Sequence, residues 1–395
     1  MKKGGKFPSV EEKPCSVSIR FCRLHKILYD AVVREGMHVR FQKRVTGITE
    51  VKGSHGGNAA VDCAFADGTR FRAAIVFAAD GSDSTAREIV ARGYGVRTEL
   101  QYTGIACLTG ISTSQTGGGV SDGDGFLAKC TARFHGCFFP SGEGDGGVCF
   151  QFHFPSPAEE DHCGDADGET MLPWEVLGAE EGRRECKYLA LRLVGGEEEG
   201  GKGWDQDGPL VRALLSDPTG VMRIRFRALR PGLSRWSAGQ VVLLGDAAHP
   251  SIPYVGQGPS LAVEDAGALS YLMGGTCLKR GEFNLSPENF GLAVRLYEEI
   301  RMPRTSPQIL NDYNFAKNGN NFGEEGSSIF RVYFQRTLPA AYTAPLYNLK
   351  KEVESMIKGA KEKRRHTRKT TAETARKLGS ARASLVHNKR ASSVA

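Results

Sequence analysis

The residues between 241 and 265 form a strand, a loop and a helix whose composition suits ligand binding. The apolar run Val241–Leu244 ends at Gly245 and Asp246, and the loop that follows contains two further glycines and two prolines. Glycine lets the main chain approach a ligand closely, and a helix N-terminus presents free N–H groups and the positive end of the helix dipole. Asp246 adds an acceptor for the hydroxyl of a polyol. The residues alone leave two interpretations open: a ligand-binding loop, or a strand-to-helix turn in which Asp246 is a local cap.

A second strand that ends in Asp-Gly lies earlier in the chain. Residues 73–79 form a short continuous apolar run, which is typical of a buried parallel strand, and Asp80 and Gly81 follow it. Ser82 and Ser84 come next and are able to cap a helix. Taken alone, this arrangement is a common strand–turn–helix connection.

His249 lies in the loop after Asp246 and is a candidate for acid–base chemistry. An imidazole at this place could act as a base beside a bound ligand. It could also hold the loop through hydrogen bonds, which is the more common role of a histidine in such a loop. The 10 cysteines are scattered and none forms a CxxC pair, so structural zinc and a disulfide scaffold are not expected. We interpret most of the cysteines as buried thiols of a reducing compartment.

Both Asp-Gly patterns resemble the fingerprints of one protein family. From Gly245 to Asp265 the chain reads GDAAHP-x2-P-x2-GQG-x3-A-x-ED. This resembles the second FAD fingerprint of the single-component flavoprotein aromatic hydroxylases, the salicylate hydroxylase-like family of FAD-dependent monooxygenases. From Asp80 to Arg87 the chain reads DG-x2-S-x2-R, which is similar to a motif of the same family that is linked to FAD and NAD(P)H use. The two motifs occur in the family's order, with a sheet-like insert between them.

The resemblance implies which residues bind the cofactor FAD. Asp246 would bind the ribityl chain, and the loop from Pro253 to Gly258 would line the isoalloxazine ring. The helix N-terminus would face the flavin edge where negative charge develops on reduction. Asp80 would lie near the pyrophosphate and the ribityl chain. The cofactor-binding residues expected on this basis are Gly245, Asp246, Pro253, Gly256, Gln257, Gly258, Asp80, Gly81, Arg20 and Arg23. No catalytic side chain is assigned, although Pro253 and His249 would lie near the flavin, and no metal is implied.

Arg20 and Arg23 rest on a weaker match at an expected N-terminal helix. The family carries an arginine three residues before a leucine, and this arginine contacts the phosphate side of FAD. Here Phe21 stands at that spacing before Leu24, and the two arginines flank it. Both can equally be surface residues of an amphipathic helix over residues 15–35. The apolar positions of this helix recur at helical spacing, at Leu24, Ile27, Leu28, Ala31 and Val32.

The expected elements favour an α/β (α+β) fold with two domains. A Rossmann-like FAD/NAD(P)-binding domain would comprise residues 15–100 and 236–345. An inserted antiparallel-sheet substrate domain with an acidic loop insert would comprise residues 101–235. Residues 346–395 would form a basic tail, either a solvated helix or a disordered segment. We expect strands over 39–51, 59–65, 73–79, 104–111, 133–139, 148–154, 188–194, 222–229 and 241–244, a hairpin turn at Asp67-Gly68, and helices over 15–35, 210–215, 260–273 and 290–301, the last ended by Pro303.

The family's first βαβ unit, which carries a GxGxxG motif and binds the ADP part of FAD, has no counterpart in this pattern. No GxGxxG occurs within the first 100 residues, so the resemblance covers about residues 15–345. We therefore expect the chain to be N-terminally truncated relative to the family, so that the FAD-binding domain lacks its first βαβ unit. Apolar surface at the strand of residues 75–79 would then be exposed.

The resemblance implies an FAD- and NAD(P)H-dependent monooxygenase that hydroxylates an aromatic or related small molecule. NAD(P)H would reduce the flavin, and O2 would supply the transferred oxygen atom. The substrate would lie between the sheet of residues 102–230 and the flavin. Two alternatives stay open: a catalytically silent flavoprotein-like fragment with a basic interaction tail, or an FAD-dependent epoxidase or reductase of the same fold.

The net charge of +7 comes from the C-terminal part of the chain. Residues 350–395 contain 14 Lys or Arg against 4 Asp or Glu, so the rest of the chain is slightly acidic and a nucleic-acid partner is not expected. The tail alone could attract an anionic membrane surface. No apolar run is long enough to span a bilayer, and the first residues do not resemble a signal peptide. We therefore expect an intracellular protein, either cytoplasmic or organellar.

Overall fold

A small sheet with two parallel strands brings the two Asp-Gly segments together. The computed structural model describes residues 19–51, 60–92, 94, 98–112, 127–130, 135–140, 147–156, 174–195, 209–216, 218–229, 232–252, 258–318, 349–363, 367 and 370. Within them, β4 (Val76–Ala78) pairs in parallel with β12 (Val241–Leu243), and β11 (Ser237–Ala238) completes the order β11-β12-β4. All three residues of β12 are fully buried. Because parallel strands end at the same edge of a sheet, the loops after β4 and β12 meet there.

Helices and a small hairpin accompany this sheet. α2 (Thr85–Arg92) follows β4, and α5 (Gly258–Thr276) follows the loop after β12. A hairpin of β13 (Leu278–Lys279) and β14 (Glu282–Phe283) links α5 to α6 (Pro287–Asn318). Buried side chains of the sheet and of these helices form one apolar cluster, which makes them a single structural unit.

A helix and a three-stranded antiparallel sheet precede β4. The helix is α1 (Phe21–Arg34), and the sheet has the order β1 (Val45–Val51), β2 (Ala60–Phe65) and β3 (Arg70–Ala73). The predicted hairpin turn is confirmed: Gly68 has φ +79°, a conformation that glycine adopts without strain. The strand expected from residue 39 begins only at Val45.

The second large part of the fold is a six-stranded sheet, antiparallel throughout. Its described strands have the order β6-β7-β8-β5-β10-β9. They are β6 (Leu127–Cys130), β7 (His135–Pro140), β8 (Val148–Pro155), β5 (Leu100–Ser112), β10 (Thr219–Leu229) and β9 (Trp174–Val176). Helices α3 (Ala179–Gly195) and α4 (Pro209–Leu215) pack on one face, where Leu108, Phe150, Cys186 and Leu214 are buried together. The antiparallel sheet expected in this region is confirmed.

The strand expected over residues 188–194 is wrong, because these residues belong to α3. Gly182, Cys186, Leu189 and Ala190 are the buried positions of this segment, and they recur at intervals of three and four residues. That spacing places them on one face of a helix against the sheet. The acidic residues Glu180 and Glu181 in the first turn suit the positive end of the helix dipole.

The helix end expected at Pro303 is also wrong, since α6 continues to Asn318. A proline inside a helix removes one main-chain hydrogen bond. Here Arg301 and Thr305 on either side of Pro303 are both fully buried, and the Thr305 hydroxyl donates to the Arg301 carbonyl at 3.1 Å. Tertiary packing on both sides of Pro303 therefore stabilises the helix across the proline.

The first part of the basic tail is packed rather than solvated. Residues 349–363 are helical, and Val353 and Ile357 are buried against α5 and α6. Leu349, Met356 and Ala360 recur on the same face at helical spacing and also contact the cluster. This segment is therefore part of the folded unit. Residues 371–395 lie outside the described residues.

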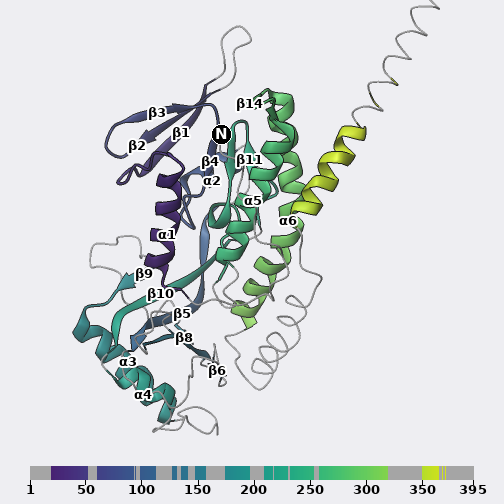
Figure 1. The fold of residues 1–395 in the computed structure, drawn as a ribbon. Coiled ribbons are helices and arrows are strands. Elements are labelled where there is room, and N and C mark those ends of the chain that lie inside the picture. The colour runs from purple at the N-terminus through teal and green to yellow at the C-terminus, as the bar shows by residue number, and fades with distance from the viewer. Residues whose placement is uncertain are drawn as a thin grey trace, which may run out of the picture.

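The six-stranded sheet and the β1–β3 sheet lie at opposite ends of the molecule. Figure 1 shows the six-stranded sheet with α3 and α4 at one end and the β1–β3 sheet at the other. Helices α5 and α6 run along one side, with the helix of residues 349–363 (yellow) outside them (Figure 1). None of the described helices has the length and apolar composition needed to cross a membrane.

Candidate functional site

The two Asp-Gly loops meet where β4 and β12 end. The Leu244 amide donates to the carbonyl of Ala78 at 2.9 Å, which extends the parallel pairing by one step. Asp80 lies two residues after Ala78, and Asp246 lies two residues after Leu244. The fold therefore brings together two motifs that lie far apart in the sequence.

Arg87 is the side chain that joins the two loops. Its guanidinium donates to the carbonyls of Ser82 (2.7 Å) and Gly81 (3.3 Å) in the first loop. It also donates to the carbonyls of Asp246 (2.5 Å) and Ala247 (2.8 Å) in the second loop. Only 2% of its surface is exposed. One buried cation thus fixes the relative position of the two motifs, because each carbonyl needs a donor when it is removed from water.

The carboxylate of Asp80 is engaged within its own turn. It accepts hydrogen bonds from the Ser84 hydroxyl at 2.5 Å and from the Ala86 amide at 3.2 Å. Ser84 in turn accepts from the Arg87 amide at 2.9 Å, which makes it the N-cap of α2. Gly81, with φ +82°, forms the turn between strand and cap. Asp80 therefore organises the turn; contact with FAD remains a prediction for Asp80 and Gly81.

Asp246 presents an unengaged carboxylate in the second loop. Asp246 lies in the short 3-10 turn of Gly245–Ala247 and is exposed. In the described part of the chain, no side chain or amide donates a hydrogen bond to its carboxylate oxygens. Partial burial raises the pKa of Asp246, while the charges of His249 and Arg87 act in the opposite direction. Gly245 before it has φ +54°, and a Cβ there would lie 3.2 Å from Ala262. The turn thus offers a free acceptor on a main chain that tolerates little beyond glycine.

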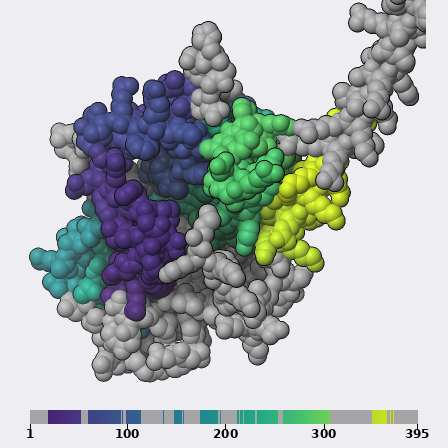
Figure 2. All heavy atoms as spheres, turned by 45° about the horizontal axis from the view of Figure 1, so that its top comes forward, coloured from purple at the N-terminus to yellow at the C-terminus, as the bar shows by residue number. Residues whose placement is uncertain are grey.

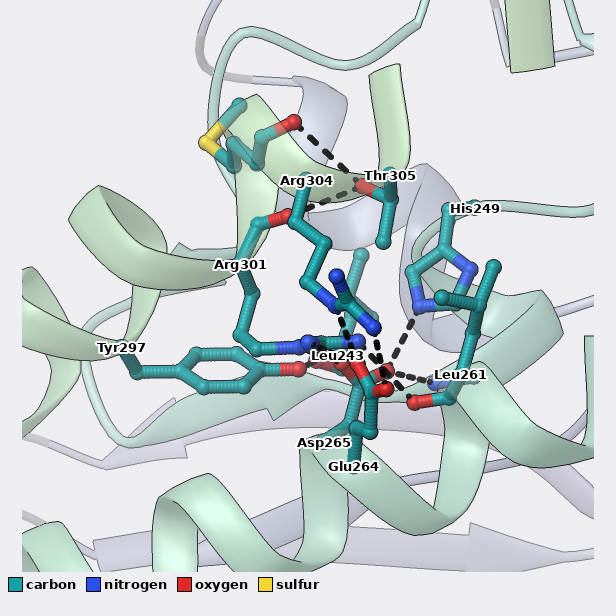
Figure 3. Close-up of polar contacts among 11 residues, drawn as sticks. Leu243, His249, Leu261, Glu264, Asp265, Tyr297, Arg301, Arg304 and Thr305 are labelled. Atoms are coloured by element: carbon teal, nitrogen blue, oxygen red, sulfur yellow. Dashed lines mark hydrogen bonds and ion pairs between the residues drawn. The ribbon is translucent and has the colours of Figure 1, made fainter. Parts of the chain in front are cut away.

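Asp265 anchors this loop from α5 (Figure 3). Its fully buried carboxylate accepts from the Gly245 amide (2.9 Å), from Nε of Arg301 (2.7 Å) and from His249, whose Nε2 lies 2.6 Å away. Burial alone would raise the pKa of Asp265, but the hydrogen bonds and charges of His249 and Arg301 hold it below its ordinary value. The carboxylate is therefore anionic and holds the glycine that precedes Asp246.

His249 is buried between Asp265 and Trp236. Its ring is 1% exposed, bonds to Asp265 and lies 5.0 Å from the Trp236 ring, centroid to centroid. Trp236 also packs against Tyr297, and the Tyr297 hydroxyl donates to the Leu243 carbonyl at 3.1 Å. These contacts favour the loop-holding role among the two roles considered for this histidine.

Two arginines of α6 complete the network. The fully buried Arg301 guanidinium contacts Glu264 at 2.5 Å, and Arg304 binds both Glu264 oxygens at 2.5 Å. Arg301 also donates to the Leu261 carbonyl at 3.2 Å. Figure 3 shows both arginines converging from α6 on the acidic pair of α5. In the sequence, the signals of this contact are a Glu-Asp pair in one helix and two arginines three residues apart in another. These patterns alone do not predict that the two helices pair.

The remaining predicted cofactor-binding residues lie at the starts of α1 and α5 or outside the described residues. Arg20 is half-buried at the N-cap of α1, with no hydrogen bond from its side chain to the cap, and Arg23 is exposed in the first turn. Gly258 is the first residue of α5, and a Cβ there would lie 3.1 Å from the Ser251 hydroxyl. Three further candidates, Pro253, Gly256 and Gln257, lie outside the described residues.

One face of the six-stranded sheet is turned toward this loop. Ile252, at the start of the segment that leads to α5, is 2% exposed and packs with Ile105, Cys107, Phe226 and Ala228. The opposite face carries α3 and α4. The apolar face of the sheet and the loop after β12 are therefore in direct contact. Among the described residues, no group of three or more His, Cys, Asp or Glu side chains could hold a metal ion.

Comparison with known proteins identifies relatives of this chain. Residues 222–276 match the family model "FAD binding domain". The matched segment begins within β10 and includes β12, the loop after it and all of α5. The chain is 27% identical over 281 residues to notoamide E oxidase notB of an Aspergillus species, covering 69% of this chain and 52% of that protein. It is 26% identical over 298 residues to 6-hydroxynicotinate 3-monooxygenase of Bordetella bronchiseptica, covering 72% and 62%.

Solved structures share the fold. A salicylate hydroxylase in complex with substrate matches with a TM-score of 0.57 at 17% identity, covering 84% of this chain and 75% of that one. Several other matching structures were determined with FAD bound. The expected fold class is confirmed: a Rossmann-like FAD-binding fold with a second, antiparallel sheet. The FAD binding domain match and the relatives named as monooxygenases agree with the resemblance that the motifs suggested. The chain spans about half to three fifths of the length of the two relatives compared above.

The geometry around Asp246 fits the flavin side of FAD. A free carboxylate acceptor at a turn that begins with a positive-φ glycine suits the ribityl hydroxyls. α5 begins at Gly258 with no acidic residue in its first turn, so its positive end is available to an electron-rich group.

Proposed function

We propose that this chain is the flavin-holding part of an NAD(P)H-dependent monooxygenase that hydroxylates an aromatic or related small molecule. The observation that carries the proposal is the unengaged Asp246 carboxylate in a turn fixed from two sides. Arg87 holds the carbonyls of the turn, and Asp265 holds the Gly245 amide. Such a rigid acceptor costs little reorganisation on binding. The matching FAD binding domain and the monooxygenase relatives support the same assignment.

Asp246, the Gly245 turn and the N-terminus of α5 would hold the ribityl and ring parts of FAD. Bound FAD, once reduced by NAD(P)H, would supply the redox chemistry that activates O2, with one oxygen atom of O2 transferred to the substrate and the other released as water. The main-chain N–H groups at the start of α5 would stabilise negative charge on the ring edge that they face. These residues bind and orient the cofactor, and no side chain is needed as a nucleophile.

The apolar face of the six-stranded sheet would form the other wall of the substrate site. Ile105, Cys107, Phe226 and Ile252 are all buried there, and they pack beside the loop after β12. A largely apolar surface of this kind suits an aromatic ring and excludes water from it. The relatives and solved structures include enzymes named for 6-hydroxynicotinate and salicylate, which share a small aromatic ring with a carboxylate. We propose that the substrate of this chain belongs to the same broad class.

A catalytically silent flavoprotein-like fragment is the second candidate. It is favoured by the self-contained hydrogen bonding of Asp80, whose oxygens already receive two donors from its own turn.

Reconstitution with FAD separates the two candidates. The purified 395-residue chain would be mixed with FAD and desalted, and retained flavin measured from its visible absorbance. NAD(P)H oxidation, O2 uptake and product formation would then be followed with 6-hydroxynicotinate, salicylate and urate as probes. Retained flavin with substrate-dependent hydroxylation supports the enzyme, and NAD(P)H oxidation with reduced or epoxidised product supports the reductase or epoxidase alternative. A colourless chain with no activity supports the silent fragment.

A further inference from the structure

The two ring nitrogens of His249 have different surroundings. Nε2 lies 2.6 Å from the Asp265 carboxylate, whereas Nδ1 is buried and has no hydrogen-bond partner within the described part of the chain. The contacts that hold the loop therefore use Nε2 and the faces of the ring, and they do not involve Nδ1. Buried polar atoms of folded proteins nearly always have a partner, so an unpaired one at a cofactor loop indicates a further role.

Asp265 decides which nitrogen of His249 carries the proton. Burial would raise the pKa of Asp265, but the hydrogen bonds and charges of His249 and Arg301 lower it, so the carboxylate is anionic. An anionic oxygen only accepts hydrogen bonds, so the Nε2–H of His249 donates to it. The neutral ring then has a lone pair at Nδ1, which can bind a proton while the bond to Asp265 stays intact.

This lone pair belongs to the segment that we assign to the flavin. The His249 amide donates to the Gly245 carbonyl at 2.9 Å, so the histidine closes the same turn that presents Asp246. Burial raises the pKa of Asp246, and a positive charge on His249 acts in the opposite direction, which places the two side chains within electrostatic reach. In the chain, His249 lies between Asp246 and the start of α5, the two parts proposed to hold FAD.

The cations around this turn already have hydrogen-bond partners. Arg87 binds four carbonyls, and Arg301 and Arg304 bind the carboxylates of α5. The charged and titratable groups that face His249 or its partners are Asp246, Arg87 of α2, Glu264 and Asp265 of α5, and Tyr297, Glu298, Arg301 and Arg304 of α6. Each guanidinium is a cation throughout, so among the described groups at this turn only His249 can gain a positive charge near neutral pH.

We propose that His249 takes up a proton when the bound flavin is reduced, and so compensates the negative charge that reduction places on the ring. The proposal rests on the assignment of this turn to FAD. Hydride transfer from NAD(P)H delivers two electrons and one proton, which adds one negative charge to the ring. A further proton, from solvent, binds the Nδ1 lone pair, and no other bond breaks. The nearby anion favours the imidazolium form, so the two charges stabilise each other.

Nitrogen NMR of the 395-residue chain with isotope-labelled histidine is the first test, and it needs no flavin. At slightly alkaline pH we expect Nε2 of His249 to carry the proton and Nδ1 to carry none. The signal is assigned by its loss in His249→Gln. A ring that already carries a proton at Nδ1 under these conditions would overturn the proposal, because no lone pair would be open to a second proton.

The second test uses the chain loaded with FAD, without O2. His249→Gln can keep an N–H donor toward Asp265 but has no acceptor at the position of Nδ1. His38→Gln is the matched control, because His38 is exposed just after α1, the purple helix at the surface in Figure 2. The pH dependence of the flavin reduction potential should show that the unaltered chain and the control bind about one more proton per reduced flavin than His249→Gln. Their preference for reduced over oxidised FAD should also be about tenfold greater.

Equal proton uptake in His249→Gln and the control would overturn the proposal, and Nδ1 would then have a purely structural partner such as an ordered water. A structural role alone would lower stability or flavin retention but would not change the number of protons. A chain that retains no flavin would refute the proposed function and this inference with it, and is recognised by its lack of visible absorbance. Retained flavin with unchanged proton uptake refutes this inference only.

Discussion

The Nε atom of Arg87 donates a 2.8 Å hydrogen bond to the carbonyl oxygen of Ala247, which lies 160 positions later in the chain. Through this contact the helix that follows β4 holds the turn that follows β12. The same guanidinium binds the carbonyls of Ser82 and Asp246. The geometry around Asp246 is therefore a joint property of the two Asp-Gly motifs, and several consequences can be measured.

Replacing Arg87 by lysine should loosen both loops. The ammonium group of lysine has fewer N–H donors than a guanidinium and cannot bind all four carbonyls. Buried carbonyl oxygens would then be left without hydrogen-bond partners. We expect the free energy of unfolding in urea to fall by about 2–4 kcal/mol. FAD affinity, measured by fluorescence titration, should fall with it. Arg92→Lys, at the exposed end of the same helix, is the control and should change neither. An Arg87→Lys protein as stable as the control would contradict the bridging role.

Replacing Asp246 by asparagine should separate cofactor binding from folding. The carboxylate is exposed and receives no hydrogen bond from the described residues, so the free energy of unfolding should stay within about 0.5 kcal/mol. Loss of a charged acceptor should weaken FAD binding by about 10- to 100-fold. Asp30→Asn, which changes an exposed carboxylate of α1, is the matched control. Equal FAD affinity in the two variants would remove Asp246 from the flavin site.

The stability of the fold should fall at acid pH because of Asp265. Its pKa in the folded chain lies below the ordinary value of 3.8, so its contribution is complete above that value and is lost as the pH falls through the folded pKa. Glu264 acts in the same direction from its ordinary value of 4.5. We expect urea unfolding to show this loss between about pH 4.5 and pH 2.

Asp265→Asn tests the same carboxylate directly. The variant replaces one of the two carboxylates that pair with the buried Arg301 cation and leaves Glu264 as its charged partner, which should cost about 3 kcal/mol near neutral pH. Its stability should depend less on pH in the acid range than that of the unaltered chain. Identical pH profiles for the two proteins would rule out Asp265 as the source of the acid sensitivity.

The helix of residues 349–363 should contribute to stability although it lies in a basic tail. Ile357 is 9% exposed and packs against Gly275 of α5, so Ile357→Ala should lower the free energy of unfolding by about 2–4 kcal/mol. Gly275→Ala should also destabilise, because the added Cβ would collide with the Ile357 side chain. Lys358→Ala, on the exposed side of the helix, is the control. A protein that loses no stability in either core variant would show that this helix does not dock.

Cysteine reactivity should follow burial. Desolvation raises the pKa of Cys186 to about 12 and that of Cys63 above its ordinary value, so few thiolates form at either site. Cys22 is exposed on α1. Alkylation with iodoacetamide at pH 8, followed by peptide mass spectrometry, should modify Cys22 in the native protein and Cys186 only as the chain unfolds in urea. Equal rates at the two sites in the native protein would contradict the burial of Cys186 between α3 and the six-stranded sheet.

Much of the local structure could be read from the sequence because local physics decides it. The buried runs at β4 and β12, the Asp67-Gly68 turn and the apolar spacing of α5 each depend on near neighbours in the chain. The GDAAHP and DG-x2-S-x2-R motifs likewise predicted a likeness to FAD-dependent monooxygenases, because tight main-chain turns of this kind tolerate few residue types.

Long-range packing decided the rest, and no local pattern contains it. Pro303 does not end α6, because Arg301 and Thr305 are buried on either side of it. Residues 188–194 look like a strand by composition but are helical, because Leu189 and Ala190 face the sheet together with Cys186.

The motif of residues 245–265 likewise depends partly on the local sequence and partly on the tertiary structure. The sequence by itself determined that Gly245 and Asp246 form a turn between a buried strand and a helix, since strand, glycine and helix signals are all local. Only the tertiary structure decided how that turn is held, with Arg87 on its carbonyls and Asp265 on the Gly245 amide. Those partners come from distant parts of the chain, and burial is what makes their charges bind the turn rather than water.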